Sequence, residues 1–355
     1  MDKSKRYVLW LEELNKDDVS VAGKKCCNLG EMRQAGLPVP PGFVMSLEAY
    51  KKFLKDSGAE DAIVDYLNKN KEKLEKDLAM FDEASNYINQ LIADKKVPAE
   101  LEEMIHEYYE KLCEDCKVPN IPLAVRSSGP VSMPGQFDTF LNIRGKDEVV
   151  KKIVQVWGSS FNARAMAYRM QRGVPVESSP IGVAAIKMVN AKSSGVMFTL
   201  DPLNGDRSRI FIEGSWGLGE SLVSGQVTPD KYILDKVTLE VSKKTICSKV
   251  MELVYDPAGD VIARDISEDR RDAPCLNDEE LLQLAKYGKL IEKHYGMPQD
   301  IEWAVDFDLT FPDNIIMLQA RPETIWNKKV KTPVLQSQGS ATEIIARQLM
   351  QGIRF

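Results

Sequence analysis

Two short polar segments near the C-terminal end of the sequence could together hold a metal ion and a phosphate chain. One contains Asp300 and Glu302, and the other contains Gln319 and Arg321. The surrounding pattern predicts two β-strands joined by a hairpin, and residues i and i+2 of a strand share one face. If the strands pair, two carboxylates, an amide oxygen and a guanidinium lie on one surface. Magnesium favours such oxygen ligands and an arginine can neutralise phosphoryl charge, whereas an exposed charged hairpin is the alternative.

Other segments supply single positive charges that could meet phosphate. Lys24 follows Gly23, so the backbone can approach a ligand closely and the lysine adds a point charge, although a surface turn explains this segment better when it is taken alone. Arg126 ends an apolar strand, where its planar guanidinium suits either phosphate oxygens or a structural salt bridge. Residues 132–136 form a loop of small residues that could fold over a phosphate chain.

Residues for a nucleotide cleft are expected between these charged segments. Lys187 and Thr199 lie in two apolar runs, 181–189 and 195–200, which predict neighbouring strands along such a cleft. Glu213 ends another predicted strand and precedes a glycine-rich turn. The sequence has no GxxxxGK[ST] motif and no complete GxGxxG motif, which excludes a P-loop and disfavours a Rossmann site.

The elements that must carry these residues follow from hydrophobic periodicity and capping. Residues 47–118 are predicted to be helical, with Ser46 as the N-cap of the first helix. Residues 147–172 return to helix, and a capping residue at 277 or 278 begins a helix that continues to Tyr295. Short strand-like runs fill most of the remaining sequence after residue 121.

Composition limits the class of protein. The chain has 355 residues, of which 43% are hydrophobic and 28% charged, as in soluble globular proteins with two or three domains or lobes. The net charge of −6 disfavours general binding to nucleic acid or anionic membranes, and no run of 18 apolar residues predicts a membrane span. Scattered cysteines and the lack of a signal-peptide pattern indicate a cytoplasmic, reduced protein. Cys113 and Cys116 lack two further ligands and are expected to be free thiols rather than a zinc site.

These segments, in this order, resemble the N-terminal ATP-binding domain of phosphoenolpyruvate synthases, pyruvate phosphate dikinases and rifampin phosphotransferases. The motifs that carry the resemblance are AGKKCCNLGEM, LPVPPGF, AVRSSGPVSMPGQFDTFLNI, SGVMFT, IEGSWGLGESLVSGQVTPDKY, QDIEWAVD and LQARPET. The resemblance implies an α+β ATP-grasp fold with ATP in the cleft between two lobes. The expected lobes are residues 1–180, which include a helical insert, and residues 181–326, followed by a linker or partner-binding tail at 327–355.

The resemblance also implies a role for each matching position. Lys24 and Arg126 are expected on the ATP phosphates. Glu302 and Gln319 are expected to hold Mg²⁺, and Arg321 to stabilise the transferring phosphoryl group, so that Lys24, Arg126 and Arg321 form the catalytic set. The residues expected to contact the nucleotide are Lys24, Arg126, Lys187, Thr199, Glu213, Asp300 and Arg321. The sequence departs from the family pattern at Ala22, Cys26 and Cys27.

The phosphate-carrying histidine of this family is expected on another polypeptide. The sequence has two histidines, His106 and His294, and neither lies in a T-S-H-type loop, so both are expected to be structural. The resemblance then implies that ATP passes its diphosphoryl portion to a histidine on a separate subunit and releases AMP. The ATP subunit of phenylphosphate synthase, with phenol as the acceptor, is the favoured member. The alternatives are an excised ATP domain of a phosphoenolpyruvate synthase or rifampin-type phosphotransferase, and a non-catalytic ATP-sensing subunit.

Overall fold

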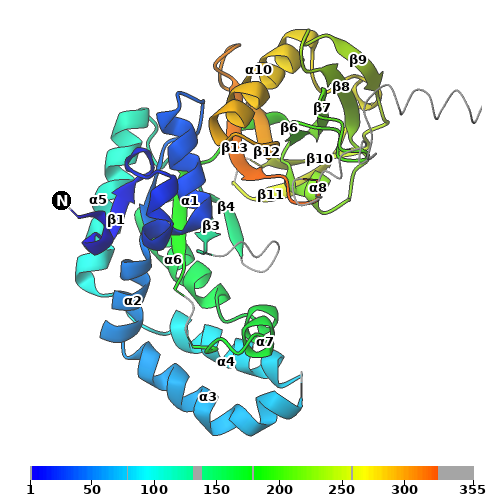
Figure 1. The fold of residues 1–355 in the computed structure, drawn as a ribbon. Helices are drawn as coiled ribbons and strands as arrows, with labels where there is room; N and C mark the ends of the chain where they lie inside the picture. The colour runs from blue at the N-terminus through cyan, green and yellow to red at the C-terminus, as the bar shows by residue number, and fades with distance from the viewer. Residues whose placement is uncertain (1, 78, 131–137, 178–179, 257–258, 327–355) are drawn as a thin grey trace, which may run out of the picture.

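The chain folds into two α+β lobes. The computed structural model describes residues 2–77, 79–130, 138–177, 180–256 and 259–326. The first lobe is drawn out by a helical arm, and the second lobe is rounder (Figure 1). The expected loop at 132–136 and the expected tail at 327–355 lie outside the described residues. Two lobes of mixed helix and sheet confirm the predicted fold class.

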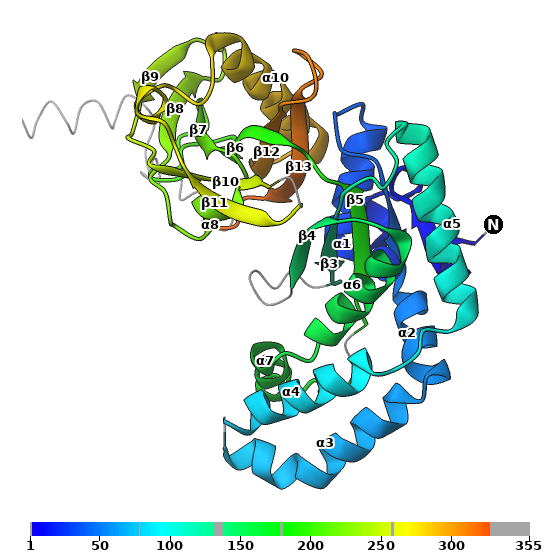
Figure 2. The ribbon, with the colours of Figure 1, turned by 180° about the vertical axis from the view of Figure 1, so that it is seen from behind.

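The first lobe is built on a five-stranded antiparallel sheet with the order β1-β2-β5-β3-β4. Its strands are β1 (Val8–Trp10), β2 (Gly42–Met45), β3 (Leu123–Ser128), β4 (Thr139–Ile143) and β5 (Gly182–Lys187). Strands β2, β3 and β5 are buried along nearly their whole length, because helices cover both faces of the sheet. The edge strand β4 lies on the side that faces the second lobe (Figures 1 and 2).

Most helices of the first lobe were predictable from periodicity. They are α1 (Val19–Gln34), α2 (Leu47–Asp56), α3 (Ala59–Lys76), α4 (Met80–Ala93), α5 (Ala99–Cys116), α6 (Lys146–Ser159) and α7 (Ala163–Gln171), with short 3₁₀ turns at η1 (Lys3–Lys5), η2 (Leu11–Glu13) and η3 (Lys16–Asp18). The Ser46 hydroxyl accepts a hydrogen bond from the Ala49 amide at 3.2 Å, which confirms the predicted N-cap. Among the described helices, none is both long enough and apolar enough to cross a membrane.

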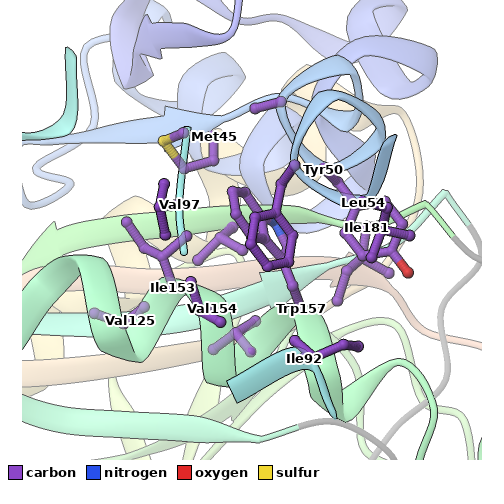
Figure 3. Close-up of a cluster of buried hydrophobic side chains, with 14 of the residues drawn as sticks. Met45, Tyr50, Leu54, Ile92, Val97, Val125, Ile153, Val154, Trp157 and Ile181 are labelled. Carbon is purple, nitrogen blue, oxygen red and sulfur yellow. The ribbon is translucent and has the colours of Figure 1, made fainter. Parts of the chain in front are cut away.

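Aromatic packing anchors the helical insert to the sheet (Figure 3). The Trp157 ring of α6 stacks on the Phe53 ring with centroids 5.0 Å apart and meets the Tyr50 ring edge-on at 6.1 Å. Ile92 from α4 and Val125 from β3 belong to the same buried cluster. Each such aromatic side chain buries 150–250 Å², so these contacts stabilise the docking of α2 and α4 against α6.

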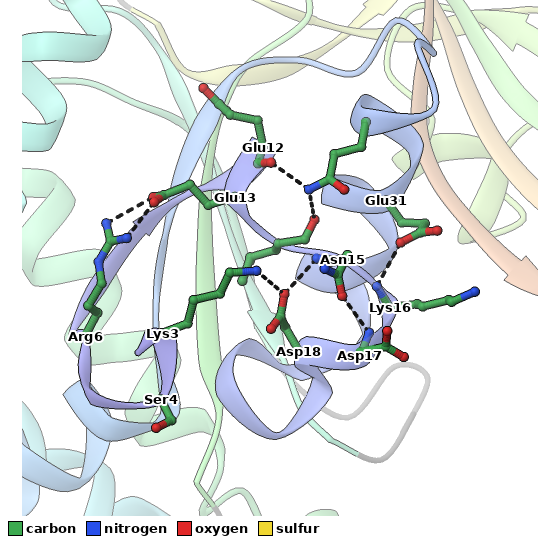
Figure 4. A network of polar contacts seen from close by, with 12 residues as sticks. Lys3, Ser4, Arg6, Glu12, Glu13, Asn15, Lys16, Asp17, Asp18 and Glu31 are labelled. Atoms are coloured by element: carbon green, nitrogen blue, oxygen red, sulfur yellow. Dashed lines mark hydrogen bonds and ion pairs between the residues drawn. The ribbon is translucent and has the colours of Figure 1, made fainter. Parts of the chain in front are cut away.

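Polar contacts hold the N-terminal segment against α1 (Figure 4). The Arg6 guanidinium donates to both carboxylate oxygens of Glu13, at 2.5 and 3.0 Å. The Lys16 amide donates to Glu31 Oε2 at 2.9 Å, which ties η3 to the body of α1. The contact with Glu31 therefore holds the N-terminal segment against α1.

The second lobe is built on a six-stranded antiparallel sheet with the order β13-β12-β6-β7-β8-β9. Its strands are β6 (Ala191–Phe198), β7 (Arg209–Trp216), β8 (Asp230–Asp235), β9 (Val241–Thr245), β12 (Gln299–Asp306) and β13 (Ile315–Pro322), and a separate ribbon pairs β10 (Met251–Tyr255) with β11 (Val261–Asp265). The helices are α8 (Glu220–Val223), α9 (Glu268–Arg271) and α10 (Asp278–Tyr295). Asn277 caps α10 in a reciprocal capping box with Glu280, so the predicted helix is confirmed at both ends.

The division between the lobes differs from the expected boundary after residue 180. Strand β5 pairs with β2 and β3 and therefore belongs to the first sheet. The two apolar runs that were expected to be neighbouring strands, β5 and β6, consequently lie in different sheets. A hydrophobic run does not encode which strands it pairs with, because that choice is made by packing. The chain thus passes from the first sheet to the second through the short connection between Lys187 and Ala191.

The two lobes share a continuous hydrophobic core. One buried cluster joins α1 residues such as Cys26 and Leu29 to second-lobe residues such as Met197 and Trp303. A hydrogen bond also joins the two lobes across this interface, which we call the seam: Asn28 Nδ2 donates to the Ala320 carbonyl at 3.0 Å. The relative placement of the lobes therefore rests on burial as well as hydrogen bonding.

Candidate nucleotide and metal site

A cavity of about 380 Å³ lies between the two sheets. Strands β3, β4 and β5 of the first lobe contribute one side, and β6, β12 and the turn leading into α8 contribute the other. This volume falls within the range of small-molecule sites in proteins. Most of the lining is apolar, and the charged residues among it are Arg126, Lys187, Glu220 and Glu302.

The predicted polar hairpin forms as expected. Strands β12 and β13 pair in antiparallel register, with Glu302 opposite Gln319 and Asp300 opposite Arg321. Directly opposed side chains have Cβ atoms about 5 Å apart, so the carboxylate and the amide of the first pair lie within reach of one ion. The shared surface inferred from the i, i+2 spacing is therefore present.

A row of cross-strand neighbours extends this surface over the sheet. Glu302 lies opposite Val196, which lies opposite Glu213, which in turn lies opposite Lys231. Glu213 thus shares the face of Glu302 at a distance of two strand spacings, about 10 Å. Its carboxylate is 3.0 Å from Lys231 Nζ and is not among the cavity-lining residues. The expected nucleotide contact of Glu213 stays a prediction.

Arg126 reaches across the cleft from the first lobe. Its Nη2 lies 3.4 Å from Glu302 Oε2, so the expected phosphate ligand and the expected metal ligand face one another. Its Nε is buried and has no hydrogen-bond partner in the part of the chain that the structure describes. Leaving a buried charged donor unpaired costs free energy, about 1–3 kcal/mol for a typical polar group and more for a charged one. An anion bound in the cavity would remove this cost.

Lys25 lies beside the charges of Arg126 and Glu302, next to Lys24, to which the resemblance assigned a phosphate contact. The Lys24 side chain is exposed, whereas Lys25 is largely buried. Burial and the neighbouring Arg126 charge hold the pKa of Lys25 below its ordinary value, and the charge of Glu302 opposes this shift. The sequence alone does not show which of the two adjacent lysines after Gly23 is the more buried.

Gly23 explains how α1 brings this lysine to the cleft. Its backbone has a φ of 78°, which kinks the helix and favours glycine. A Cβ at this position would lie 2.1 Å from the Ser128 carbonyl oxygen, so no larger residue fits. The Lys24 amide donates to the Gly129 carbonyl at 3.0 Å, so the part of α1 that follows the kink is hydrogen-bonded to the residue after β3.

Of the two residues expected along the nucleotide cleft, Lys187 lines the cavity and Thr199 does not. Thr199 is fully buried, and its hydroxyl accepts a hydrogen bond from the Gln299 amide at 2.9 Å. Its hydroxyl therefore stabilises the junction between β6 and β12. Thr199 follows the last residue of β6, and its expected nucleotide contact stays a prediction.

Asp300 and Arg321 form an ion pair on the rim of the site. Their closest atoms are 2.7 Å apart, and the Arg321 side chain is 44% exposed. Burial raises the pKa of Asp300, and the Arg321 charge partly offsets that shift. Neither residue lines the cavity, so the phosphoryl-stabilising role of Arg321 remains a prediction that requires it to leave Asp300.

The donor set fits magnesium shared with a phosphate chain. Glu302 and Gln319 offer hard oxygen atoms, and no described residue hydrogen-bonds to the Gln319 side chain. Among the described residues there is no group of three or more acidic, histidine or cysteine side chains that could hold a metal alone. Magnesium is commonly held by one or two protein oxygens together with substrate phosphates, which is what this site provides.

The cysteines form no site of their own in the described chain. Cys113 and Cys116 form no disulfide within the described chain. Cys26 and Cys27 are fully buried in the core shared by the lobes, so packing explains these departures from the family pattern. Burial raises the pKa of the Cys26 thiol to about 12, which disfavours the reactive thiolate.

Two antiparallel sheets with a cavity between them match the ATP-grasp fold that the resemblance implies. The chain belongs to the family described as "Pyruvate phosphate dikinase, AMP/ATP-binding domain", whose model matches residues 19–341. It is therefore an ATP-binding domain of the dikinase type.

The curated relatives are longer proteins. A "Probable phosphoenolpyruvate synthase" of Staphylothermus marinus is 42% identical over 353 residues, which cover 92% of this chain and 42% of that protein. A protein of the same name from Methanocaldococcus jannaschii is 39% identical and covers 99% of this chain and 29% of its own length. The "Phosphoenolpyruvate synthase" of Aeropyrum pernix is 38% identical and covers 92% and 43%. The chain thus spans less than half the length of these relatives.

Proposed function

We propose that this chain binds Mg²⁺·ATP between its lobes and transfers the diphosphoryl portion of ATP to a histidine on another domain or subunit. In this reaction the bond between the α-phosphate and the β-phosphorus breaks, a bond forms between the β-phosphorus and an imidazole nitrogen, and AMP leaves. The pairing of Arg126 with Glu302 across the cleft carries the proposal, because it sets an anion-binding group opposite a metal-binding group.

The chain's own residues act by binding and positioning. Arg126 and Lys25 supply positive charge from the first lobe, and Glu302 with Gln319 supplies oxygen atoms from the second. Bound magnesium would neutralise charge on the phosphate oxygens. Phosphoryl transfer needs little covalent help from a protein, so a cleft that aligns these groups and excludes water supplies most of the rate enhancement.

The two histidines of the chain are poorly placed to accept a phosphoryl group from ATP. His106 Nε2 lies 3.2 Å from Asp147, and His294 Nε2 lies 2.6 Å from Glu31. Neither histidine lines the cavity. This supports an acceptor histidine on a separate domain or subunit, as the resemblance implies.

The relatives favour the phosphoenolpyruvate synthase reaction over phenol phosphorylation. The relatives named above are phosphoenolpyruvate synthases. No contact in the cleft argues for a phenol acceptor. We therefore propose that the phosphohistidine serves pyruvate, with the acceptor bound on another part of the enzyme, and phenol becomes an outcome to be tested.

Calorimetric titration with ATP tests the binding step. We expect Arg126→Ala and Glu302→Gln to weaken Mg²⁺·ATP binding at least tenfold, and the effect of Glu302→Gln to shrink when EDTA removes the metal. Arg172→Ala is the matched control, because this arginine is exposed at the end of α7. Equal affinity for all variants would reject the assigned site.

A labelling experiment tests the transfer step. The chain is incubated with ATP labelled at the β-phosphate and with the histidine-bearing domain of one of the synthase relatives. AMP and labelled, base-stable phosphohistidine are then measured. AMP formation that depends on the added domain supports the proposal. Tight ATP binding without AMP or labelled histidine would instead identify a non-catalytic ATP sensor. Pyruvate and phenol are then compared as final acceptors.

A further inference from the structure

Trp303 joins three of the sequence motifs through residues that the proposed function does not use. Its cross-strand partner in β6 is Gly195, whose own partner in β7 is Gly214. These three residues belong to the motifs QDIEWAVD, SGVMFT and IEGSWGLGESLVSGQVTPDKY. Segments that are far apart in the chain thus meet in one row across the second sheet (Figure 1).

The indole of Trp303 occupies the space that side chains on the two glycines would fill. A Cβ on Gly195 would lie 2.7 Å from indole Cζ2, and a Cβ on Gly214 would lie 2.8 Å from indole Cη2. Both distances are too short for a real Cβ atom, so the indole excludes larger residues at either position. Glycine weakens a strand and marks places where another group approaches closely. The glycine pair therefore forms a slot for the ring, which we call the indole slot.

The size of the ring explains why a tryptophan lies here. Both close contacts are made by atoms of the six-membered ring, at the far end of the indole, which a phenyl ring on the same backbone would not reach. Trp303 is fully buried, and its Nε1 has no hydrogen-bond partner among the described residues. A buried donor without a partner is unfavourable, so the side chain is held by its shape and not by a hydrogen bond.

The pairing of β12 with β13 is irregular beside the indole slot. Glu302 lies opposite Gln319. Trp303, the next residue, lies opposite Met317, which leaves Leu318 over as a bulge. Met317 packs in the same core cluster as Trp303, whereas Leu318 lines the cavity. Bulges re-aim side chains next to functional sites, so the register at this point decides which residue faces Glu302.

Trp303 and Glu302 point to opposite faces of β12, because successive side chains of a strand alternate. The Trp303 side chain belongs to the core shared by the lobes, and the Glu302 carboxylate faces Arg126 across the cavity. A slip of one residue would turn Glu302 away from the cavity. An indole that fits only in its slot therefore also fixes the direction of the neighbouring carboxylate.

We propose that Trp303 is a positioning residue: its indole, packed in the slot, holds the register at which Glu302 faces Gln319 and so sets how strongly Mg²⁺ assists ATP binding. This inference rests on the proposed function, because it assigns the metal to those two residues. In this role Trp303 touches neither the metal nor the nucleotide. Its effect therefore belongs to the dependence of binding on metal and not to the metal-free affinity for ATP.

Calorimetric titrations with ATP, in magnesium and in EDTA, test the inference through the ratio of the two affinities. Trp303→Leu should lower this ratio about fivefold or more, toward the value of Glu302→Gln, and change the affinity in EDTA by less than about twofold. Trp303→Phe should retain part of the ratio. Trp157→Phe is the matched control, because Trp157 is fully buried in the separate core of the first lobe. It should lower thermal stability and leave the ratio unchanged.

A second pair of variants tests the indole slot itself. Gly214→Ala keeps the tryptophan but places a Cβ 2.8 Å from its ring, so it should lower the ratio as Trp303→Leu does. The shorter phenyl ring leaves room for that Cβ, so the double variant Gly214→Ala/Trp303→Phe should recover a higher ratio than Gly214→Ala alone. Circular dichroism checks that each variant folds, and this pair decides the question if Trp303→Leu does not.

Each other outcome has a distinct meaning. An unchanged ratio in folded Trp303→Leu and Gly214→Ala overturns the role of Trp303 but leaves the ATP site intact. An equal loss of affinity in magnesium and in EDTA also overturns it, because the effect is then a general one on the cleft. A ratio that falls as far in Trp157→Phe assigns the loss to stability alone. If Glu302→Gln itself leaves the ratio unchanged, the proposed metal site is wrong, and this inference is removed with it.

Discussion

Lys24 and Lys25 are adjacent in the sequence but occupy different environments. Lys24 is exposed, whereas Lys25 is largely buried beside the charges of Arg126, Glu302 and Arg321. A charge that is shielded from water interacts more strongly with its neighbours than an exposed one. The phosphate contact of Lys24 stays a prediction, and we propose Lys25 as a second candidate for it.

We predict that Lys25→Ala weakens Mg²⁺·ATP binding by tenfold or more, whereas Lys24→Ala changes it by less than about threefold. The same calorimetric titration measures both variants, and each serves as the matched control for the other. A larger effect at Lys24 would show that its side chain turns into the cleft when nucleotide binds.

A second residue-scale prediction concerns the thiols. Burial raises the pKa values of Cys26, Cys27 and Cys275. Because the thiolate is the reactive form, we expect these three to react slowly with a thiol reagent at pH 8 in the folded chain, and all six cysteines to react quickly in denaturant. Mass spectrometry of the labelled peptides identifies the sites, and rapid native labelling of Cys26 would contradict its buried position.

At the scale of single elements, α10 illustrates how local sequence sets a boundary. The Asn277 side chain accepts from the Glu280 amide at 2.8 Å, and the Glu280 carboxylate accepts from the Asn277 amide at 2.9 Å. This reciprocal pair satisfies two amides that would otherwise lack partners at the start of the helix. Since α10 packs on β12 and β13, the cap also supports the strands that carry Glu302 and Gln319.

We predict that Asn277→Ala lowers the free energy of unfolding by about 1 kcal/mol, whereas Asn277→Ser has a smaller effect because serine also caps helices. Urea denaturation followed by circular dichroism measures the difference. Equal stability of the alanine and serine variants would show that the side-chain cap contributes nothing measurable.

At the scale of the whole molecule, the seam between the lobes contains an ion pair. His294 on α10 lies 2.6 Å from Glu31 on α1, and the Lys16 amide donates to the same carboxylate. Burial alone would raise the pKa of Glu31, but these two hydrogen bonds outweigh it and hold the pKa below its ordinary value. A carboxyl group with a depressed pKa in the folded state stabilises that state above its unfolded pKa, and this contribution is lost as pH falls through the folded value.

Glu31→Gln should therefore flatten the dependence of stability on pH on the acid side, below about pH 4.5, relative to wild type. Thermal unfolding between pH 3 and 7 measures the effect. Glu12→Gln is the control, because Glu12 is a half-exposed acid that lies 3.5 Å from Arg33 on the same lobe. An identical change in the pH dependence of stability in both variants would show that the loss of any one negative charge causes the effect, rather than the loss of the Glu31 contacts between the lobes.

The sequence by itself determined the local features of this protein. The β12–β13 hairpin, the caps at Ser46 and Asn277, and the helices between residues 47 and 118 all follow from contacts between residues close in the chain. Such contacts have a fixed period and a recognisable residue preference, so one sequence is enough to read them. The i, i+2 spacing placed Asp300 and Glu302 on one face for the same reason.

Only the tertiary structure decided which distant residues share the cleft. Arg126 and Glu302 are 176 residues apart, and β5 joins the first sheet whereas β6, the next strand in the chain, belongs to the second. Thr199 does not line the cavity, whereas Glu220, which the sequence analysis did not single out, does. These outcomes depend on how the lobes bury their shared core, and burial is not directional enough for a hydrophobic pattern to specify its partners.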